Sequence, residues 1–577
     1  MVTNSIAAPH LPVHLGSMST CVRTQADIWK GKLKRGDVIV SNHPEFGGTH
    51  LPDITVITPA FSGDEIIFYV ASRAHHADIG GILPGSMPPH SRELYQEGAA
   101  IKSEKLVSEG KFNEKRITEL LYDEPAQYPE CSGTRCLADN INDLKAQIAA
   151  NQKGINLIST LIEDYGEEVV QFYMINIQDN AELSVRNLLK DVSKRFEGQD
   201  LHAIDYMDDG SPIELKITIN AEKGEAVFDF DGTGPEVYGN SNPFFVKKCN
   251  NFEQELRQHQ RPRSRHLLGN NLLPTLPHLR RHPPQPRLPQ THRRPHPQEF
   301  VPLPLRQSSS RRRQRPHRKL SSTPFLPPHS PSSPHELPQT NPPPSLPQSQ
   351  RVTDVILRSF AACAASQGDC NNLTFGFGGN PSTSAQPTKG FGYYETIAGG
   401  SGAGPSWDGT DGVHTHMTNT RITDAEVFER RYPVLLREFA LRRGSGGAGL
   451  HPGGEGVVRD IEFRIPVQVS ILSERRVFHP YGLAGGEDAQ CGRNIWVRKI
   501  AKGGRGGDRE EVVERRVNLG GKNTAAMQAG ERIVVMTPGG GGWGVVGGER
   551  KVVGRVDPER GWRKGSLASR IETQETI

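Results

Sequence analysis

Apolar runs separated by polar loops mark the first hundred residues of the chain. GDVIVSNHP (36–44), ITVITPAF (54–61) and DEIIFYVASRAHH (64–76) are short, rich in β-branched and aromatic residues, and bounded by Gly, Pro or charged residues. Such runs are typical of buried strands. The pattern predicts a sheet whose polar loops lie at the strand ends.

A helical period replaces this pattern between residues 139 and 190. Apolar positions recur at helical spacing there, and Gly154 and Gly166 interrupt them, which predicts three consecutive helices. From 213 to 237 apolar and polar residues alternate around a turn signal at 222–224, which predicts a hairpin.

The last third of the chain combines one helical stretch with many glycines. Residues 352–367 have the spacing of a short amphipathic helix, and strand-like runs punctuated by glycine continue to Trp543. We therefore expect an α+β (mixed α/β) protein. Its N-terminal part would be a sheet with a helical segment, and its C-terminal part would be glycine-rich and mostly β.

Residues 244 to 350 do not fit either part. Positions 251–350 hold 22 of the 44 prolines but one of the 61 glycines, and no Ala, Ile, Asp, Met, Tyr, Trp or Cys. Such a segment cannot bury enough apolar surface to offset the entropy of ordering it, so we expect disorder. Leu, Pro, His, Gln and Arg, whose codons can begin with cytosine, make up 71 of these hundred residues. We infer a frameshift or a retained intron.

A genuine basic linker is the competing interpretation of this segment. RQSSSRRRQRPHRK (306–319) resembles an arginine-rich localisation or nucleic-acid tract, although composition alone supports that interpretation. The expected organisation is an N-terminal part at 1–243, the anomalous segment at 244–350, a C-terminal part at 351–545 and a tail at 546–577.

Charge and cysteine content narrow the functional class only slightly. Lys and Arg number 69 against 65 Asp and Glu, so the balance gives no general argument for a nucleic-acid or membrane partner. Seven scattered cysteines in 577 residues do not form a disulfide framework. The chain shows no charged leader and no long apolar run, and we expect a cytoplasmic protein.

Two glycine-flanked loops contain the strongest chemical signal. FGGTHLPDITV (46–56) and ASRAHHADIGG (71–81) place His50, Asp53, His75, His76 and Asp78 at the ends of adjacent predicted strands. Two histidines and a carboxylate with open positions bind Fe(II), Mn(II) or Zn(II), and such a metal could polarise a carbonyl or activate water. The alternative is that these histidines only bond to nearby backbone.

Two further groups of polar residues are candidates for the site. Glu395, His414 and His416 could move protons, and Asn419 and Arg421 could bind substrate in the same glycine-rich loops. Loop scaffolding explains them as well. Before the first predicted helix, Arg135, Asp139 and Asn140 make a possible anion site, or a helix cap with a surface ion pair.

These stretches resemble the hydantoinase B/oxoprolinase family. In the first part the resembling motifs are GGTHLPD (47–53), AHHADIGG (74–81) and SGTRCLADNINDLKAQIAANQKG (132–154). Beyond the anomalous segment they are NNLTFGFGG (371–379), YYETIAGGSGAGPSWDGTDGVHTHMTNTRITD (393–424) and TPGGGGWG (537–544). The resemblance covers most of the chain apart from residues 244 to 350.

The resemblance implies the hydrolytic half of an ATP-dependent 5-oxoprolinase. A hydantoinase A-like half, as a separate subunit or fused, would phosphorylate the lactam carbonyl of 5-oxo-L-proline, and this half would hydrolyse it to L-glutamate within glutathione metabolism. The chain has no G-x-x-x-x-G-K-[ST] loop of its own for ATP. We expect an oligomer, with a divalent metal (Mn, Fe or Zn) on His50, Asp53 and His75, or on His76 instead of His75.

Other functions remain open at this point. An N-methylhydantoinase or an acetone carboxylase-type subunit would have the same family motifs, with another carbonyl compound as substrate. A non-catalytic remnant is the third possibility, because the middle of the family domain is replaced in this chain.

Overall fold

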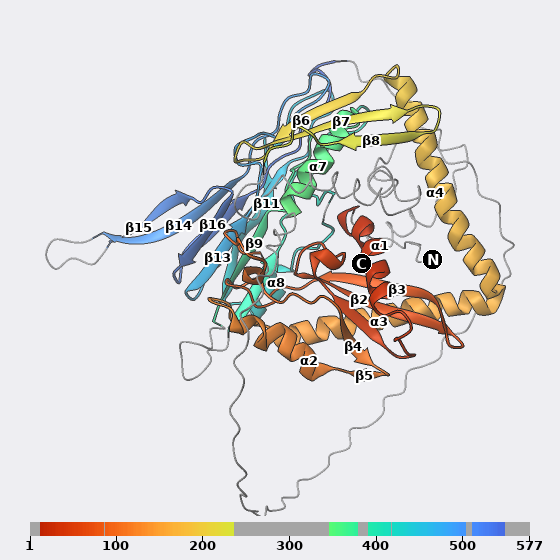
Figure 1. The fold of residues 1–577 in the computed structure, drawn as a ribbon. Helices are drawn as coiled ribbons and strands as arrows, with labels where there is room; N and C mark the ends of the chain where they lie inside the picture. Colours follow the sequence, from red (N-terminus) through yellow and green to blue (C-terminus); the bar gives the residue numbers. More distant parts are fainter. Residues whose placement is uncertain are drawn as a thin grey trace, which may run out of the picture. The chain divides into compact units, whose positions relative to one another are not determined.

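The apolar runs at the start of the chain form a five-stranded antiparallel sheet in the computed structural model (Figure 1). Its order is β3-β2-β1-β4-β5, with β1 Val38–Ser41, β2 Asp53–Ser62, β3 Glu65–His75, β4 Glu104–Ser108 and β5 Lys111–Phe112. All of β1 and most of β2 are buried. The three predicted strands are therefore confirmed, and β1 and β2 carry the core of this part.

The structure describes residues 12–85, 87–235, 346–378, 390–416, 418–502 and 511–548, which all belong to one unit of the fold. The anomalous segment from 244 to 345, with its expected disorder, lies outside the described residues, as does the tail beyond 548. Residues 346–350 are described and begin helix α7 (Leu346–Ser359). This helix thus begins a few residues before position 351. It ends at Ser359 rather than at 367, since Ala361 has a positive φ of 44°.

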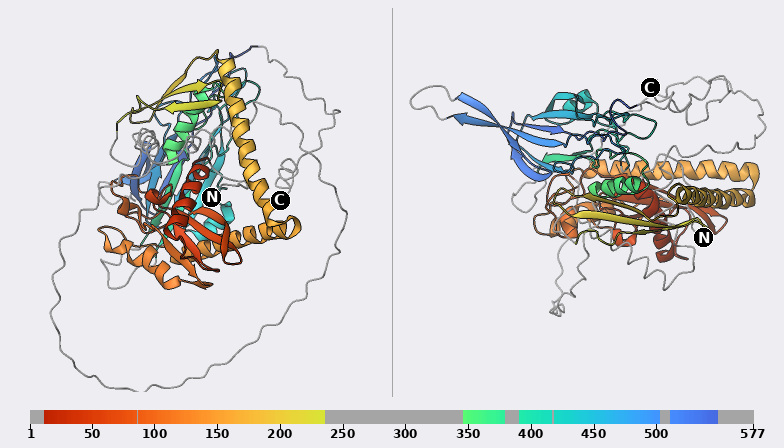
Figure 2. Two further views of the ribbon diagram at one scale, coloured as in Figure 1. Left: turned by 45° about the vertical axis from the view of Figure 1, so that its right-hand side comes forward. Right: turned by 90° about the horizontal axis from the view of Figure 1, so that it is seen from above.

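Two long helices, α3 (Leu137–Tyr165) and α4 (Glu167–Arg195), occupy the region where three were predicted (Figures 1 and 2). Gly166, with φ 83°, ends α3, but Gly154 lies inside it, so that prediction was wrong. A glycine inside a helix costs about 1 kcal/mol relative to alanine. Here a Cβ would lie 3.1 Å from Val70 Cγ1 on β3, so Gly154 allows α3 to approach the sheet closely.

A second, three-stranded sheet follows α4. Its order is β6-β7-β8, with β6 Leu201–Tyr206, β7 Pro212–Asn220 and β8 Glu225–Asp229. Residues from the C-terminal half of α4 and from α7 pack on it to form one apolar core. The predicted hairpin is the β7–β8 pair, which turns at the expected position.

Two antiparallel sheets make up the C-terminal part and confirm its mostly β character. One has the order β10-β9-β13-β16, with β9 Asn372–Phe377, β10 Phe391–Glu395, β13 Val467–Leu472 and β16 Lys522–Met527. The other has the order β11-β12-β17-β14-β15, with β11 Val434–Arg442, β12 Gly456–Phe463, β14 Arg493–Lys502, β15 Glu511–Asn518 and β17 Arg532–Met536. Their apolar side chains form a shared core, as in a β-sandwich.

Shorter helices complete the described fold. The α-helices among them are α1 (Pro12–Ile28), α2 (Glu114–Thr118) and α8 (Ala425–Arg431). Three are short 3-10 helices, η1 (Pro44–Phe46), η2 (Leu94–Glu97) and η4 (Pro125–Gln127), and η3 (Glu119–Asp123) is a π-helix. Among the described helices, none has the length and apolar content that crossing a membrane requires.

Glycine-rich loops of the C-terminal part pack backbone against backbone. A Cβ on Gly540 would lie 1.9 Å from the carbonyl oxygen of Ser401, and one on Gly453 would lie 1.8 Å from that of Gly540. Gly540 N also donates to Gly454 O at 2.9 Å. These glycines are therefore needed for close packing between loops.

Buried ion pairs join the three-stranded sheet to α7 and to the loop after β13. Arg475, which is fully buried, lies 2.8 Å from an Asp205 oxygen and 3.2 Å from an Asp354 oxygen. Arg351 of α7 lies 3.2 Å from the other oxygen of Asp205. The network links β6, α7 and the C-terminal part through charge-assisted hydrogen bonds.

Candidate functional site

The register of β2 and β3 brings Asp53 and His75 together. They are directly opposite residues in this antiparallel pair, and opposite residues project to the same face of a sheet. His76, one residue further, turns away. The structure thus distinguishes the two histidines that the sequence left equivalent.

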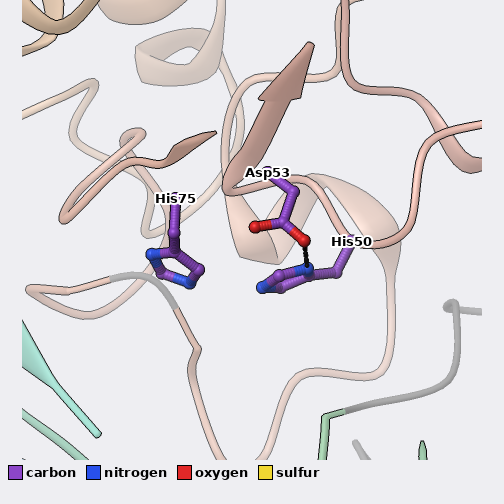
Figure 3. Close-up of side chains that lie close together, drawn as sticks. All are labelled: His50, Asp53 and His75. Carbon is purple, nitrogen blue, oxygen red and sulfur yellow. Dashed lines mark ion pairs between the residues drawn. The ribbon is translucent and has the colours of Figure 1, made fainter. Parts of the chain in front are cut away.

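His50 reaches the same place from the loop that precedes β2. Asp53 N donates to His50 O at 3.0 Å, and this turn brings His50 Nδ1 to 2.7 Å from Asp53 Oδ2 (Figure 3). A Cβ on Gly48 would lie 2.1 Å from Asn42 O, so the loop can fold inward only with glycine at this position. The glycines of the GGTH motif therefore help to position His50.

The side chains of His50, Asp53 and His75 turn toward one common space (Figure 3). One ligand atom from each lies within 4.8 Å of the others, and His50 and Asp53 are buried. His50 Nε2 is also buried and has no hydrogen-bond partner among the described residues. A carboxylate that orients one imidazole nitrogen while the other stays available is the usual arrangement around a metal.

The protonation states of these groups suit a cation. Burial, reinforced by the nearby His50, lowers the pKa of His75 to about 3. Burial opposes ionisation of Asp53, but the neighbouring histidines His50 and His14 outweigh it and hold the pKa of Asp53 well below its usual range. At neutral pH the site therefore offers a neutral imidazole and a carboxylate, the donor set of divalent transition metals.

His14 of α1 is a further member of this cluster. Its Nε2 lies 3.4 Å from Asp53 Oδ2, and burial lowers the pKa of His14 to about 4. Thr49 Oγ1 donates to the same carboxylate oxygen at 2.6 Å. The Asp53 carboxylate is thus contacted by His14 of α1 and by Thr49 of the loop that precedes β2.

The C-terminal part contributes an aromatic ring to the cluster. Tyr394 of β10 stacks on His75, with the ring centroids 4.1 Å apart and the planes at 14°. Its hydroxyl donates to Asn372 Oδ1 at 2.9 Å. The side-chain nitrogen of Asn372 is buried and has no hydrogen-bond partner in the described residues. This amide can donate to a ligand beside the ring.

Glu97 at the end of η2 is a buried acid near this cluster. Burial raises the pKa of Glu97 to about 7, although the nearby His50 and a hydrogen bond from Ser91 at 3.3 Å act in the opposite direction. A carboxyl group with this pKa exchanges a proton readily at neutral pH, as general acid–base catalysis requires.

His76, Asp78, Arg135 and Asn140 form a different cluster. Asn140 Nδ2 lies 3.0 Å from His76 Nδ1 and donates to Asp78 O at 3.0 Å. Arg135 pairs with the Asp78 carboxylate at 3.1 Å and donates to Gly378 O at 2.9 Å. The structure thus uses these residues to connect the 76–85 loop, α3 and β9. Asp139 lies apart, in an exposed ion pair with Arg431 at 2.5 Å.

The candidate residues of the second part do not gather at one point. Glu395 is buried in a two-point ion pair with Arg459, at 2.7 and 2.9 Å. His416 Nε2 lies 3.2 Å from Asp354 Oδ1, which connects it to the buried arginine network. Burial lowers the pKa of His414, whereas Asn419 and Arg421 are exposed.

Sequence reasoning missed four residues that surround the cluster. They are His14, Glu97, Asn372 and Tyr394. Asn372 and Tyr394 lie within stretches that resemble the family, but nothing local marks them as neighbours of His75. Contacts across more than three hundred residues of sequence, such as that of His75 with Tyr394, leave no periodic signal.

Comparison with known proteins shows which family and which sequences this chain resembles. The family model described as hydantoinase B/oxoprolinase matches residues 3–248 and 338–546, which leaves out most of the anomalous segment. The chain is 48% identical over 554 residues to a Saccharomyces cerevisiae protein named 5-oxoprolinase. That alignment covers 93% of the chain but 38% of the yeast protein.

Two solved structures share the fold. The ATP-dependent caprolactamase of Pseudomonas jessenii matches with a TM-score of 0.61 at 21% identity, covering 93% of this chain and 82% of that one. A nucleotide-free acetone carboxylase matches with a TM-score of 0.62 at 15% identity, covering 92% and 68%. At such identities the likeness concerns the fold.

Proposed function

The chain belongs to the hydantoinase B/oxoprolinase family, and from this premise we propose that it is the hydrolytic half of an ATP-dependent 5-oxoprolinase. Its site would be the cluster of His50, Asp53 and His75. The 48% identity to a yeast 5-oxoprolinase supports this substrate over others in the family. Nothing in the chain resembles an ATP-binding loop, so an ATP-binding half is required as partner.

The observation that carries the proposal is the position of the three ligand atoms within 4.8 Å of one another. A neutral His75 imidazole and an ionised Asp53 carboxylate fit a divalent metal such as Mn, Fe or Zn, and the unpartnered His50 Nε2 fits the same interpretation. When bound, such an ion supplies Lewis acidity that polarises a carbonyl group and acidifies water.

Two further residues, Glu97 and Asn372, would transfer the proton and bind the substrate. Hydrolysis of the lactam joins a water oxygen to the carbonyl carbon, breaks the C–N bond and delivers a proton to nitrogen. Glu97, with a pKa near neutrality, would take the proton from water and return it to the leaving nitrogen. The free amide of Asn372 would donate to an oxygen of the substrate beside Tyr394.

The length of the relatives supports the need for a partner half. The chain spans about 38% of the yeast protein that it matches, so most of that polypeptide has no counterpart here. We place ATP binding and carbonyl phosphorylation on a hydantoinase A-like half. Phosphorylation makes a resistant amide electrophilic. In the B-type half one water then opens the ring at the C–N bond and a second water releases the phosphate, so that each turnover yields L-glutamate, ADP and phosphate.

A chimaeric enzyme tests the proposal. The matching portion of the yeast protein is replaced by this chain, and ATP-dependent conversion of 5-oxo-L-proline to L-glutamate is measured. We expect activity that His75→Ala abolishes and that His202→Gln, a change at an exposed histidine of β6, leaves intact. Metal content is measured in the same preparations.

The alternatives give different outcomes in this assay. An inactive chimaera whose chain still binds a stoichiometric metal would favour another substrate, and acetone or N-methylhydantoin would then be tried with ATP. A chain that binds no metal and gives no turnover would show that the proposal is wrong and that the chain is a remnant.

A further inference from the structure

A groove lies between α3 and the five-stranded sheet, at the opposite end of β2 from the histidine cluster. Its volume is about 620 Å³, within the range of about 300–1,000 Å³ that small-molecule sites have. Asp53 begins β2, whereas residues 58–61 line the groove, so the two sites are roughly 20 Å apart along the strand. We call this site the α3 groove. Its apolar lining includes Val38, Ala60, Phe61, Phe68, Phe112 and Ile148.

One wall of the α3 groove is a single face of α3. Ile148, Gln152, Ile155 and Ser159 line it at intervals of three and four residues, which places them on one side of the helix. At 1.5 Å per residue this wall is about 16 Å long. Such a length suits an extended ligand rather than a compact one.

The sheet provides the opposite wall, and the structure fixes its distance from α3. Asn151 Nδ2 donates to Val56 O at 3.0 Å and to Thr58 Oγ1 at 3.2 Å, which ties α3 to β2 beside the groove. Phe61 and Phe68 line the groove and are only half-buried. The groove is therefore a preformed apolar site, in which a ligand would remove these rings from water.

The acidic charge in the lining of the α3 groove is already compensated. Asp37 is the one acidic residue among the described residues that line it. The Asp37 carboxylate lies 2.7 Å from Lys105 Nζ and accepts from the backbone nitrogens of Lys34 and Glu109, each at 2.9 Å. The groove therefore has no acidic group left to bind a cationic ligand.

The two basic residues of the lining differ in this respect. Lys145 has a carboxylate partner, Glu114, at 3.8 Å. Arg35 forms no ion pair with any described residue, and its Nη2 donates to Gly63 O at 2.9 Å. Its guanidinium carbon lies 5.8 Å from the centre of the Phe61 ring. Arg35 is thus an uncompensated cation beside an apolar wall.

We propose that the α3 groove binds a carboxylate with an unbranched apolar chain, of the medium-chain fatty-acid class. The carboxylate accepts hydrogen bonds from Arg35, whose planar guanidinium matches its geometry. The chain lies along Phe68, Ile148 and Ile155. A neutral ligand would leave the guanidinium unpaired, and a small anion would leave the apolar walls in water. This binding goes beyond the proposed hydrolysis and uses no residue of the histidine cluster.

Calorimetric titration of the full chain with decanoate, below its micelle-forming concentration, tests the groove. We expect one saturable site, and an affinity that increases roughly fourfold for each methylene from octanoate to decanoate. Gln152→Trp, which fills the groove from an exposed position of α3, should weaken binding roughly tenfold or more. Lys153→Trp is the matched control, because Lys153 is equally exposed on α3 but does not line the groove.

The charged end of the ligand is tested separately. Arg35→Gln should weaken decanoate binding at least tenfold and leave the binding of 1-decanol unchanged, since a charge-assisted hydrogen bond is lost. Lys34→Gln is the control, because Lys34 pairs with Glu109 at 2.6 Å and does not line the groove. Circular dichroism and thermal unfolding verify that each variant is folded.

Several results would overturn the proposal. They are an unchanged chain that binds no decanoate, a Gln152→Trp variant that binds it as tightly as the unchanged chain, and equal affinities for decanoate and 1-decanol. Titration of the same variants with Mn²⁺ keeps this test separate from the proposed hydrolase site. We expect the metal affinity to be the same in all of them, because the histidine cluster lies at the other end of β2.

Discussion

Two buried polar clusters in this chain differ in how their charges are paired. In the arginine network, Arg475 and Arg351 meet Asp205 and Asp354 at 2.8 to 3.2 Å, and positive and negative groups are matched. In the histidine cluster, burial lowers the pKa of His75 and of His14 beside the single carboxylate of Asp53, and His50 Nε2 has no partner among the described residues.

The difference separates a structural role from a binding role. Matched charges in the interior satisfy one another, and removal of one member leaves an uncompensated charge. A buried nitrogen with an available lone pair costs stability unless a ligand occupies it. His50 Nε2 is such a nitrogen, and it lies beside the start of β2 in the family motif GGTHLPD.

Breaking the arginine network should have the largest effect. Asp205→Asn leaves Arg475 and Arg351 without their common carboxylate, and we expect a loss of about 3–5 kcal/mol in the free energy of unfolding. Urea titration measures it. Metal affinity of the folded fraction should stay unchanged, and a stable Asp205→Asn protein would show that the network contributes little.

Removing a ligand from the histidine cluster should affect binding rather than folding. His75→Ala should weaken metal binding at least 100-fold, about 2.7 kcal/mol, because one of three donors is lost. Calorimetric titration with Mn²⁺ or Zn²⁺ measures the affinity. His76→Gln is the control, since His76 bonds to Asn140 instead. Equal losses in both variants would contradict the assignment.

The aromatic contact from β10 should have a smaller effect on the same titration. Tyr394→Ala removes the ring that fixes His75, and we expect metal affinity to fall about tenfold, as for other outer-shell groups. Tyr394→Phe keeps the ring and should restore most of the affinity. Identical losses in the two variants would mean that the hydroxyl, and not stacking, matters.

Acid should gradually lower the free energy of unfolding of the metal-free protein. His14 and His76 have folded pKa values of about 4, below the unfolded value of 6.5, so the unfolded chain binds more protons in this range. Stability from these groups is complete above pH 6.5 and decreases toward pH 4, by up to about 1.4 kcal/mol per pH unit for each histidine. His76→Gln should reduce the slope of the free energy of unfolding against pH by the contribution of one histidine. An unchanged slope in urea titrations between pH 6 and 5 would contradict this.

The apolar runs and glycines of the sequence predicted the features that depend on neighbouring residues alone. The strands that become β1, β2 and β3 were predicted from their apolar runs, and the loop with His50 and Asp53 from its glycines. The choice between His75 and His76 depends on strand register, which apolar alternation did not fix for a strand half-buried on both faces. Gly154 was misread because its role depends on Val70 of another element.

Long-range pairing determines the surroundings of other candidate residues. Glu395 is a plausible catalytic acid in a glycine-rich loop, yet Arg459 on β12 holds it in a buried ion pair. Arg135 was a possible anion site, but Asp78 and the backbone at Gly378 use its donors. In both cases the partner is distant in sequence, so no spacing rule could reveal it.

The ion pair of Asp205 with Arg475 also has a consequence for how the chain is made. The two residues are 270 positions apart, and a ribosome adding about 5–20 residues per second needs roughly 14 to 54 seconds to travel between them. During that interval β6 has left the ribosome while the Arg475 guanidinium that pairs with Asp205 does not yet exist. The nascent first half must wait in an unfinished state, and a ribosome that stalls within the proline-rich stretch would prolong its exposure to chaperones and proteases.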